Sequence, residues 1–169
     1  AATNIALSAG VTASGQAQPA SLAIDNNPGT RWESTHAVDP GWIRLDFGSA
    51  KALGSVVIDW EAANAASYRV EGSNNDTSWV TLASINGGTF GNRTDTLTVS
   101  GSYRYLRVYA TARSGGNQWG YSIFELKVYS SGEVPVSSAV SSIRSSTPAS
   151  IPASSSSRSS AAVAPSSSS

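Results

Sequence analysis

The chain has 169 residues and a formal net charge of zero, with 11 basic and 11 acidic side chains. Duplex nucleic acid is bound largely through an excess of basic residues that neutralises phosphates, so this balance argues against a nucleic-acid partner. The absence of cysteine excludes disulfides, thiolate zinc sites and thiol nucleophiles, and no apolar run approaches the roughly 20 residues of a membrane span.

The first distinctive segment in chain order is the turn Asp25-Asn26-Asn27-Pro28-Gly29-Thr30. It brings one carboxylate, two amides, a hydroxyl and the carbonyls of a tight turn together in six residues. Such a density of hard oxygen ligands suits calcium and does not suit zinc or copper. The same residues also suit an Asx-type turn that is held by its own side chains, and the local sequence leaves both interpretations open.

The chain from residue 42 to residue 129 has the alternating pattern of β-strands. In its first segment Ile43, Leu45 and Phe47 fall on one face, and the charged residues between them fall on the other. The predicted strands are Trp42–Phe47, Leu53–Trp60, Ser67–Glu71, Trp79–Leu82, Asp95–Val99, Tyr103–Tyr109 and Phe124–Tyr129. Turn clusters of Gly, Ser, Asn and Asp separate them, and no apolar stripe has the helical period. This pattern predicts an all-β fold, an antiparallel β-sandwich or jelly roll.

The connections between these strands predict where functional residues gather. If consecutive strands alternate in direction, the connections alternate between the two ends of the sandwich, and every long loop falls at the same end. The long loops are 31–41, 61–66, 83–94 and 110–121. The other end has only short turns. Because function on such scaffolds usually lies where long loops converge, we expect the binding site at the long-loop end.

The last 40 residues, Ser130–Ser169, differ in composition from the rest of the chain. They hold 19 serines, four of the seven prolines and none of the 14 aromatic residues. A segment so poor in large apolar groups cannot bury enough surface to offset the entropy of ordering its backbone. We therefore expect one folded domain over residues 1–130 and a disordered Ser/Pro-rich linker over residues 131–169. A linker of this kind implies a second module on the same polypeptide.

Seven short motifs follow one another along residues 4–129. They are Asn4-Ile5-Ala6, Ala23-Ile24-Asp25-Asn26-Asn27, Thr30-Arg31-Trp32, Trp42-Ile43-Arg44-Leu45-Asp46-Phe47-Gly48, Ser67-Tyr68-Arg69-Val70-Glu71-Gly72-Ser73, Tyr105-Leu106-Arg107-Val108 and Trp119-Gly120-Tyr121-Ser122-Ile123-Phe124-Glu125-Leu126. Each is weak alone, but the ordered set resembles the discoidin family, also called the coagulation-factor C-terminal domain. In bacteria this family overlaps family 32 of the carbohydrate-binding modules. The resemblance implies an eight-stranded jelly roll of the galactose-binding-domain type, in agreement with the strand pattern.

The resemblance also implies a metal site, because members of the family usually hold a structural calcium close to the ligand-binding end. The implied ligands are the Leu22 carbonyl, Asp25, Asn27, Thr30 through its carbonyl and hydroxyl, and Glu125. Asn27 stands where an acidic residue is common, which predicts a lower affinity for the metal here. The role would be structural, since the site joins an early loop to the final strand.

The long-loop end holds side chains suited to a sugar, which offers hydroxyls for hydrogen bonds and C–H faces for stacking on aromatic rings. Trp119 lies in a Gly-rich loop where core packing does not explain a large ring, and Tyr121 begins the last strand. Glu61 follows a strand end and has small neighbours that leave room for a ligand. Because related glycan-binding members place residues at similar positions in their site, the resemblance also implies Arg31 and His36 as ligand contacts.

Each of these five candidates has a plainer interpretation. The ring of Trp119 would simply cover the end of the sandwich, and Tyr121 would belong to the last strand. Glu61 and His36 would be solvent-exposed loop residues, and Arg31 would pair with a nearby carboxylate. The sequence leaves these alternatives open.

Catalysis is not expected. The single histidine, His36, has no nucleophile-elbow context, and no sequence feature sets Glu33 and Glu61 at the separation of a glycosidase pair. We expect a secreted, extracellular bacterial module, monomeric, that targets a linked glycoside hydrolase to a polysaccharide and so raises the local concentration of the enzyme. The expected ligand is a β-glucan, a galactose-bearing chain or an amino-sugar glycan.

The alternative function belongs to a different class. Eukaryotic discoidin relatives are cell-surface adhesion modules that bind membrane phosphatidylserine or protein receptors through hydrophobic loop spikes. The loops of this chain lack paired Leu, Phe or Met at their tips, and the two cysteines of those relatives are missing. The sequence therefore favours the carbohydrate-binding module.

Overall fold

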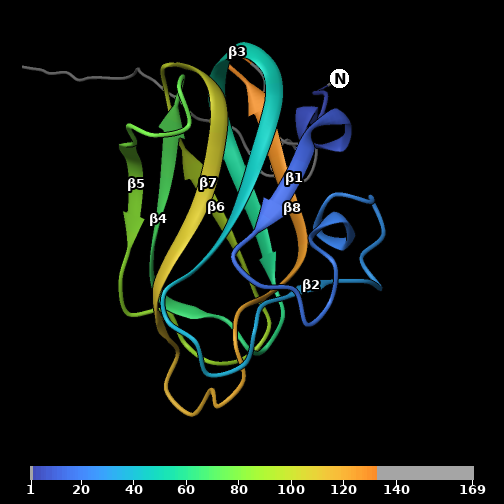
Figure 1. Ribbon diagram of the computed structural model, residues 1–169, viewed down its shortest axis with the longest axis vertical. Helices are drawn as coiled ribbons and strands as arrows, with labels where there is room; N and C mark the ends of the chain where they lie inside the picture. Colours follow the sequence, from blue (N-terminus) through green and yellow to red (C-terminus); the bar gives the residue numbers. More distant parts are fainter. Residues whose placement is uncertain (1, 133–169) are drawn as a thin grey trace, which may run out of the picture. The chain divides into compact units, whose positions relative to one another are not determined.

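The computed structural model describes residues 2–132 (Figure 1). Nearly all of the predicted disordered linker lies outside the described residues, so that prediction stays open. The elements in chain order are the 3-10 helix η1 (Ile5–Ser8), β1 (Gly10–Ala13), the 3-10 helix η2 (Ala20–Ala23), β2 (Trp32–Glu33), β3 (Gly41–Trp60), β4 (Ala65–Ser73), β5 (Val80–Ile85), β6 (Arg93–Thr98), β7 (Ser102–Arg113) and β8 (Ser122–Ser130). No helix within residues 2–132 is long and apolar enough to span a bilayer.

The strands pair antiparallel and form two sheets that share β3. The first half of β3 pairs with β1 and β7, and that sheet continues through β4 to β5. The second half of β3 pairs with β6 and β8, and β8 also pairs with β2. Figure 1 shows β3 rising in one layer, turning at the top and descending in the other. The described residues thus confirm the predicted antiparallel jelly roll.

The structure differs from the predicted strands in two ways. The predicted strands Trp42–Phe47 and Leu53–Trp60 are the two halves of β3, whose register shifts between Asp46 and Lys51. The short strands β1 and β2 were not predicted, because runs of four and two residues show too little alternation to stand out.

The core lies between the two sheets, and in the first half of β3 and in β7 it takes every second residue. Ile43 and Leu45 of β3 and Leu106 and Val108 of β7 are buried, whereas Arg44 stays on the outer face with its side chain 22 % exposed. The alternation read from the sequence therefore marks the inward face correctly. Burying a side chain of this size stabilises the fold by roughly 1.5–3 kcal/mol.

An aromatic pair closes the core toward the long-loop end. The rings of Trp60 and Tyr68 meet edge to face, with centroids 5.2 Å apart. The indole nitrogen of Trp60 and the hydroxyl of Tyr68 both donate hydrogen bonds to Asp95. Burial, followed by these contacts with Asp95, raises the pKa of Tyr68, so its hydroxyl remains a donor. The pair fixes the end of β3 from which the next residue, Glu61, enters the loop.

The connections after β3, β5 and β7 lie at one end, as predicted, but the turn after β4 at the other end, residues 74–79, is longer than the connection 61–64 after β3. Figure 1 shows the connections after β3, β5 and β7 at the lower end, and the turns after β4 and β6 at the upper end. Strand direction alone produces this separation, because each antiparallel neighbour returns the chain to the opposite end.

Candidate functional site

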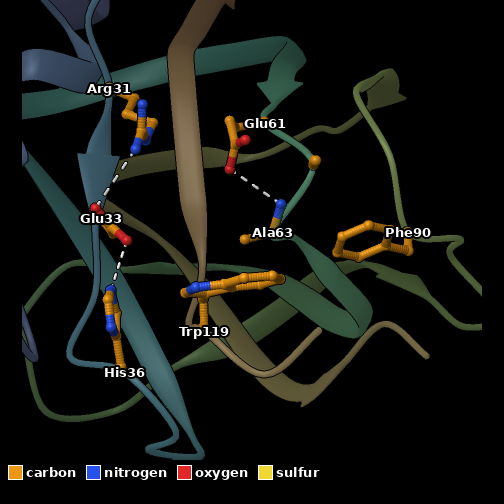
Figure 2. A pocket seen from close by; sticks show the side chains of 8 residues that line it. Arg31, Glu33, His36, Glu61, Ala63, Phe90 and Trp119 are labelled. Carbon is orange, nitrogen blue, oxygen red and sulfur yellow. Dashed lines mark hydrogen bonds and ion pairs between the residues drawn. The ribbon is translucent and has the colours of Figure 1, made fainter. Parts of the chain in front are cut away.

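A cavity of about 320 Å³ opens at the long-loop end (Figure 2). Its lining residues are Arg31, Glu33, His36, Glu61, Ala62, Ala63, Phe90 and Trp119. They come from four separate segments of the chain that the loop alternation places together. Four of the five residues predicted to contact ligand, namely Arg31, His36, Glu61 and Trp119, line this cavity.

Asn64 holds three of the loops in place. Its side chain is fully buried, and its amide nitrogen donates to the Gly91 carbonyl at 2.7 Å. Its backbone carbonyl accepts hydrogen bonds from the Ser114 backbone at 3.1 Å and from the Asn117 side chain at 2.9 Å. Buried hydrogen bonds of this kind are expensive to break, so the cavity walls are preformed.

The loop that carries Trp119 is fixed through its backbone, which leaves the ring accessible. The Trp119 amide donates to the Asn117 side chain at 2.9 Å, and its carbonyl accepts from the Ala37 amide at 2.8 Å. The side chain itself is 43 % exposed. The ring is therefore held at the cavity and is not folded into the core of the sandwich.

Phe90 is a second aromatic residue in the cavity, and the sequence analysis missed it. It is 44 % exposed, and its ring lies 6.3 Å from that of Trp119 with an interplanar angle of 23°. The two rings come from different loops and present neighbouring, nearly parallel faces (Figure 2). The available signal was the placement of Phe90 among Gly87, Gly88 and Gly91, which matches the Gly-rich surroundings of Trp119.

Arg31, Glu33 and His36 form a chain of contacts in the cavity. The carboxylate of Glu33 lies 3.7 Å from an Arg31 nitrogen and 2.6 Å from Nε2 of His36 (Figure 2). Arg31 thus pairs with a nearby carboxylate, Glu33, in line with its plainer interpretation. The Glu33 side chain is only 13 % exposed, so its charge is largely satisfied within the protein.

Glu61 is different, because its carboxylate has no basic partner in residues 2–132. One oxygen accepts a hydrogen bond from the Ala63 amide at 3.0 Å, which orients the side chain across its own turn. The small side chains of Ala62 and Ala63 leave open space beside it. Glu61 therefore gives the cavity an uncompensated negative charge.

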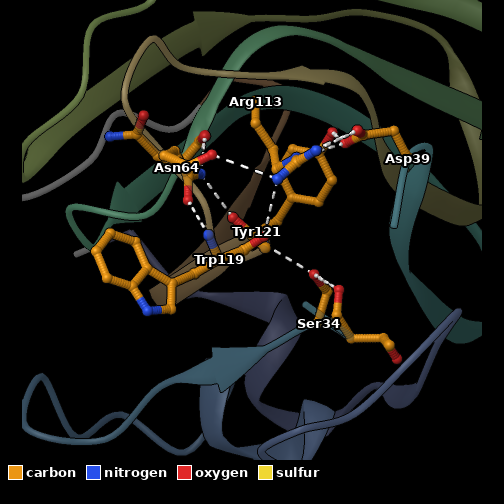
Figure 3. Close-up of polar contacts among 9 residues, drawn as sticks. Ser34, Asp39, Asn64, Arg113, Trp119 and Tyr121 are labelled. Carbon is orange, nitrogen blue, oxygen red and sulfur yellow. Dashed lines mark hydrogen bonds and ion pairs between the residues drawn. The ribbon is translucent and has the colours of Figure 1, made fainter. Parts of the chain in front are cut away.

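Tyr121 does not line the cavity. Its side chain is fully buried, and its hydroxyl donates to Asp39, which also accepts from Arg113 at 3.0 Å (Figure 3). The Tyr121 amide donates to the Ser34 hydroxyl at 2.8 Å. Burial, together with the Asp39 contact, raises the pKa of Tyr121. Tyr121 joins the loops on either side of the cavity and supports the site from behind, where a sugar cannot reach it.

The turn predicted to bind a metal lies against β8. Asp25 accepts hydrogen bonds from the Asn27 amide at 3.0 Å and from the Thr30 hydroxyl. The Asn27 amide also donates to Glu125 at 3.2 Å, which joins the turn to the last strand. Asp25, Asn27, Thr30 and Glu125 are therefore together. Leu22 lies in η2, three residues before Asp25, and shares no hydrogen bond with the other four in the described part of the chain.

Two carboxyl groups meet at this turn. Glu125 is 2 % exposed, and its Oε1 is buried without a hydrogen-bond partner. Burial and a hydrogen bond with Asp25 raise the pKa of Glu125 to about 8. Desolvation acts to raise the pKa of Asp25, but hydrogen bonds from Thr30, Glu125 and the backbone lower it overall. Within residues 2–132 no three His, Cys, Asp or Glu side chains are grouped to hold a metal, so any cation here would need neutral oxygens as well.

The sequence matches the family model of the F5/8 type C domain over residues 6–126. No curated protein sequence matches the chain significantly.

Several solved structures are similar to this fold. Chitosan-binding module 1 of a chitosanase/glucanase from Paenibacillus sp. IK-5 has a TM-score of 0.70 and 37 % identity, covering 75 % of this chain and 98 % of the module. Module 2 of the same enzyme, in complex with chitotriose, has a TM-score of 0.69 and 33 % identity, covering 75 % and 99 %. The family 32 module of NanJ from C. perfringens, in complex with galactose, has a TM-score of 0.65 and 23 % identity, covering 76 % and 99 %, and shares the fold.

Proposed function

The chain belongs to the F5/8 type C domain family, and from this premise we propose that it is a carbohydrate-binding module of the family 32 type that takes an amino-sugar glycan such as chitosan. The observation that carries the proposal is the Glu61 carboxylate, which lies in the cavity with no basic partner in residues 2–132. The two chitosan-binding modules, at 33 % and 37 % identity, support this choice among sugars.

The chemistry of an amino sugar fits the cavity. A protonated glucosamine unit carries an ammonium group, and a charge-assisted hydrogen bond from that group to Glu61 is stronger than one from a neutral hydroxyl. The apolar face of the same sugar ring can stack on Trp119. The two interactions fix one sugar unit from two directions.

The other polar residues in the cavity can orient the sugar and do not compete with Glu61 for the ammonium group. Glu33 is already contacted by Arg31 and His36, so it adds little uncompensated charge. The outer nitrogens of Arg31 are then donors for sugar hydroxyls, and the outer ring nitrogen of His36 is a further hydrogen-bonding group. Glu61 remains the carboxylate that distinguishes an amino sugar from a neutral one.

The adhesion alternative receives less support from the same cavity. Phe90 and Trp119 are exposed apolar side chains, as a membrane-inserting loop requires. They share their cavity with Arg31, Glu33, His36 and Glu61, and three charged groups and an imidazole beside the rings oppose insertion into a lipid interior. We therefore assign the pair to sugar stacking.

We further propose that the module belongs to a secreted carbohydrate-active protein and carries no catalytic residues of its own. The Ser/Pro-rich composition of residues 131–169 supports a tether to a catalytic module.

Calcium is the proposed structural ion, held by Asp25, Asn27, Thr30, Glu125 and the Leu22 carbonyl. The residues fit such an ion because Oε1 of Glu125 is buried and unpartnered and the Asp25 carboxyl group interacts with the same Glu125 side chain. Buried polar atoms are normally satisfied, and a hard cation satisfies two carboxylates at once. The ion would join the turn at residues 25–30 to β8 near the cavity.

Calorimetry with chitotriose, its fully N-acetylated form and galactose tests the proposed ligand. We expect the parent protein to bind chitotriose most tightly. Glu61→Gln should weaken that binding by about 1.5–3 kcal/mol, roughly tenfold or more, because it removes a charge-assisted hydrogen bond.

Asp76→Asn is the matched control. Asp76 lies in the turn after β4, and its φ of 63° is one that asparagine tolerates. The substitution also replaces a carboxylate by an amide, and it should leave binding unchanged. Equal binding of chitotriose by Glu61→Gln and by the parent would refute the amino-sugar assignment, and tighter binding of galactose would favour a neutral glycan.

A further inference from the structure

We propose that the glycan extends past the first cavity into a second subsite on the outer face of β3, β6 and β8, where Phe124 provides the stacking ring. This inference rests on the proposed function, because the second subsite would take further sugar units of the same ligand. It concerns a separate cavity of about 300 Å³, similar in volume to the first. Its lining residues are Pro28, Asp59, Trp60, Asn92, Arg93, Thr94 and Phe124.

The two cavities are lined by neighbouring residues of the same two chain segments. Trp60 of the second cavity is followed directly by Glu61 of the first, and Asn92 of the second comes two residues after Phe90 of the first. Trp60 and Arg93 are register partners in neighbouring antiparallel strands, which brings these two segments side by side. An oligosaccharide bound at the Phe90 and Trp119 rings of the first cavity can therefore extend into the second cavity.

Phe124 is not explained by the core. Its neighbours in β8, Ile123 and Leu126, are fully buried, whereas Phe124 is only partly buried and lines the second cavity. An aromatic ring on the outer face of a strand beside polar groups is the combination that sugar stacking requires.

The charged side chains around Phe124 already have partners within the protein, so this cavity presents no free charge to a ligand. Each side-chain nitrogen of Arg93 already donates a hydrogen bond, to Asp95 or to one of two backbone carbonyls. Arg93 therefore lines the cavity without offering an unpaired positive charge. Asp59 accepts from the Thr94 hydroxyl at 2.8 Å and lies 3.7 Å from the Lys127 nitrogen. With both charges compensated, the cavity offers hydrogen-bonding groups and an aromatic face, which suits the hydroxyls of a sugar.

Asn92 is the polar residue best placed to meet such a ligand. It is exposed, lies between the two cavities in sequence and makes no side-chain hydrogen bond to residues 2–132. An amide offers two donors and an acceptor, so it can bond to adjacent hydroxyls of one sugar.

A chain-length series on the complete 169-residue chain tests the second subsite. The probes are fully deacetylated chitosan oligosaccharides of two, three and six units, measured by calorimetry. We expect the parent to bind the hexamer more tightly than the dimer. Phe124→Ala should lower affinity for the hexamer about tenfold and leave the dimer unchanged.

Asn92→Ala is a second test that does not depend on correct folding of the Phe124 variant. The exposed Asn92 side chain makes no hydrogen bond within residues 2–132, so its removal should leave the fold intact. It should also weaken the hexamer alone. Thr96→Ala, an exposed change on β6 outside the cavity, is the matched control and should bind every probe like the parent.

The outcomes separate the two proposals. If dimer and hexamer bind equally to the parent while Trp119→Ala still weakens binding, the second subsite is refuted and the proposed function stands. An equal loss for dimer and hexamer in Phe124→Ala also refutes it. If no oligosaccharide binds, or Trp119→Ala has no effect, the proposed function itself fails and the second subsite with it.

Discussion

Glu61 and Glu125 both lack a basic partner within residues 2–132, yet their surroundings differ. Glu61 lies at the open cavity, where one oxygen accepts from the Ala63 amide and the rest of the carboxylate faces free space. Glu125 is 2 % exposed, and its Oε1 has no hydrogen-bond partner. Burial and the neighbouring Asp25 raise the pKa of Glu125 to about 8, whereas solvent reaches Glu61.

The difference shows that burial decides whether a carboxylate acts in ligand recognition or in stabilising the fold. A carboxylate at an open cavity remains hydrated and charged until a cationic ligand arrives, so it can discriminate between ligands. A buried carboxylate without a partner is costly, so it must hold a proton or a cation at all times. We therefore expect Glu61 to act in binding and Glu125 to act in stability.

Removing calcium should give the largest effect. It should lower the stability that depends on Glu125 and leave the cavity at Glu61 unchanged. A ligand that binds only the folded state at a hundredfold excess over its Kd stabilises the fold by about 2.7 kcal/mol. A chelator should therefore lower the melting temperature, and Asp25→Ala should abolish most of that response. Differential scanning calorimetry measures both.

Glu61→Gln is the control for this experiment, because it changes the other glutamate. It should melt like the parent with calcium and with chelator. Superimposable melting curves of the parent in the two conditions would contradict the calcium site.

The strands could be predicted because burial alternates along them. Ile43 and Leu45 are buried and Arg44 between them is not, so the period-two pattern in the sequence reports the inward face directly. The continuity of β3 could not be predicted. Gly48 adopts a φ of 83° in the bend, and locally a glycine in that conformation looks like a turn that ends a strand.

The cavity could be predicted from the alternation of loops, but not all of its contacts could. Asn64 forms hydrogen bonds with residues 27 and 53 positions away in the sequence, and no local sequence pattern predicts such contacts. Tyrosine is a residue type that often contacts sugars, but the sequence did not show that the Tyr121 ring points into the core. Phe90 was missed because the long loops offered several candidates and only folding places its ring beside Trp119.

Trp119→Ala should have a smaller effect than removal of calcium, and it changes the cavity that contains Glu61. Losing the stacking face should weaken binding by about 1–1.5 kcal/mol, close to tenfold. Trp119→Phe should recover part of this loss because it keeps a smaller aromatic face. Affinity electrophoresis with chitosan measures the change, and the melting response to calcium should stay that of the parent. Parent-like binding by Trp119→Ala would place the sugar elsewhere.

The smallest effect on binding is expected at the short-turn end. The Asn75 side chain accepts hydrogen bonds from the amides of Thr77 at 3.0 Å and Ser78 at 2.8 Å, so Asn75→Ala should lower the free energy of unfolding by about 1 kcal/mol. Ser102→Ala removes an exposed hydroxyl and should leave stability nearly unchanged. Because neither residue lines either of the two proposed sugar cavities and both lie at the end opposite Trp119, both variants should bind chitotriose like the parent below their melting temperatures. A loss of binding in either variant, with the fold intact by circular dichroism, would mean that the sugar site lies at the end of the sandwich opposite Glu61.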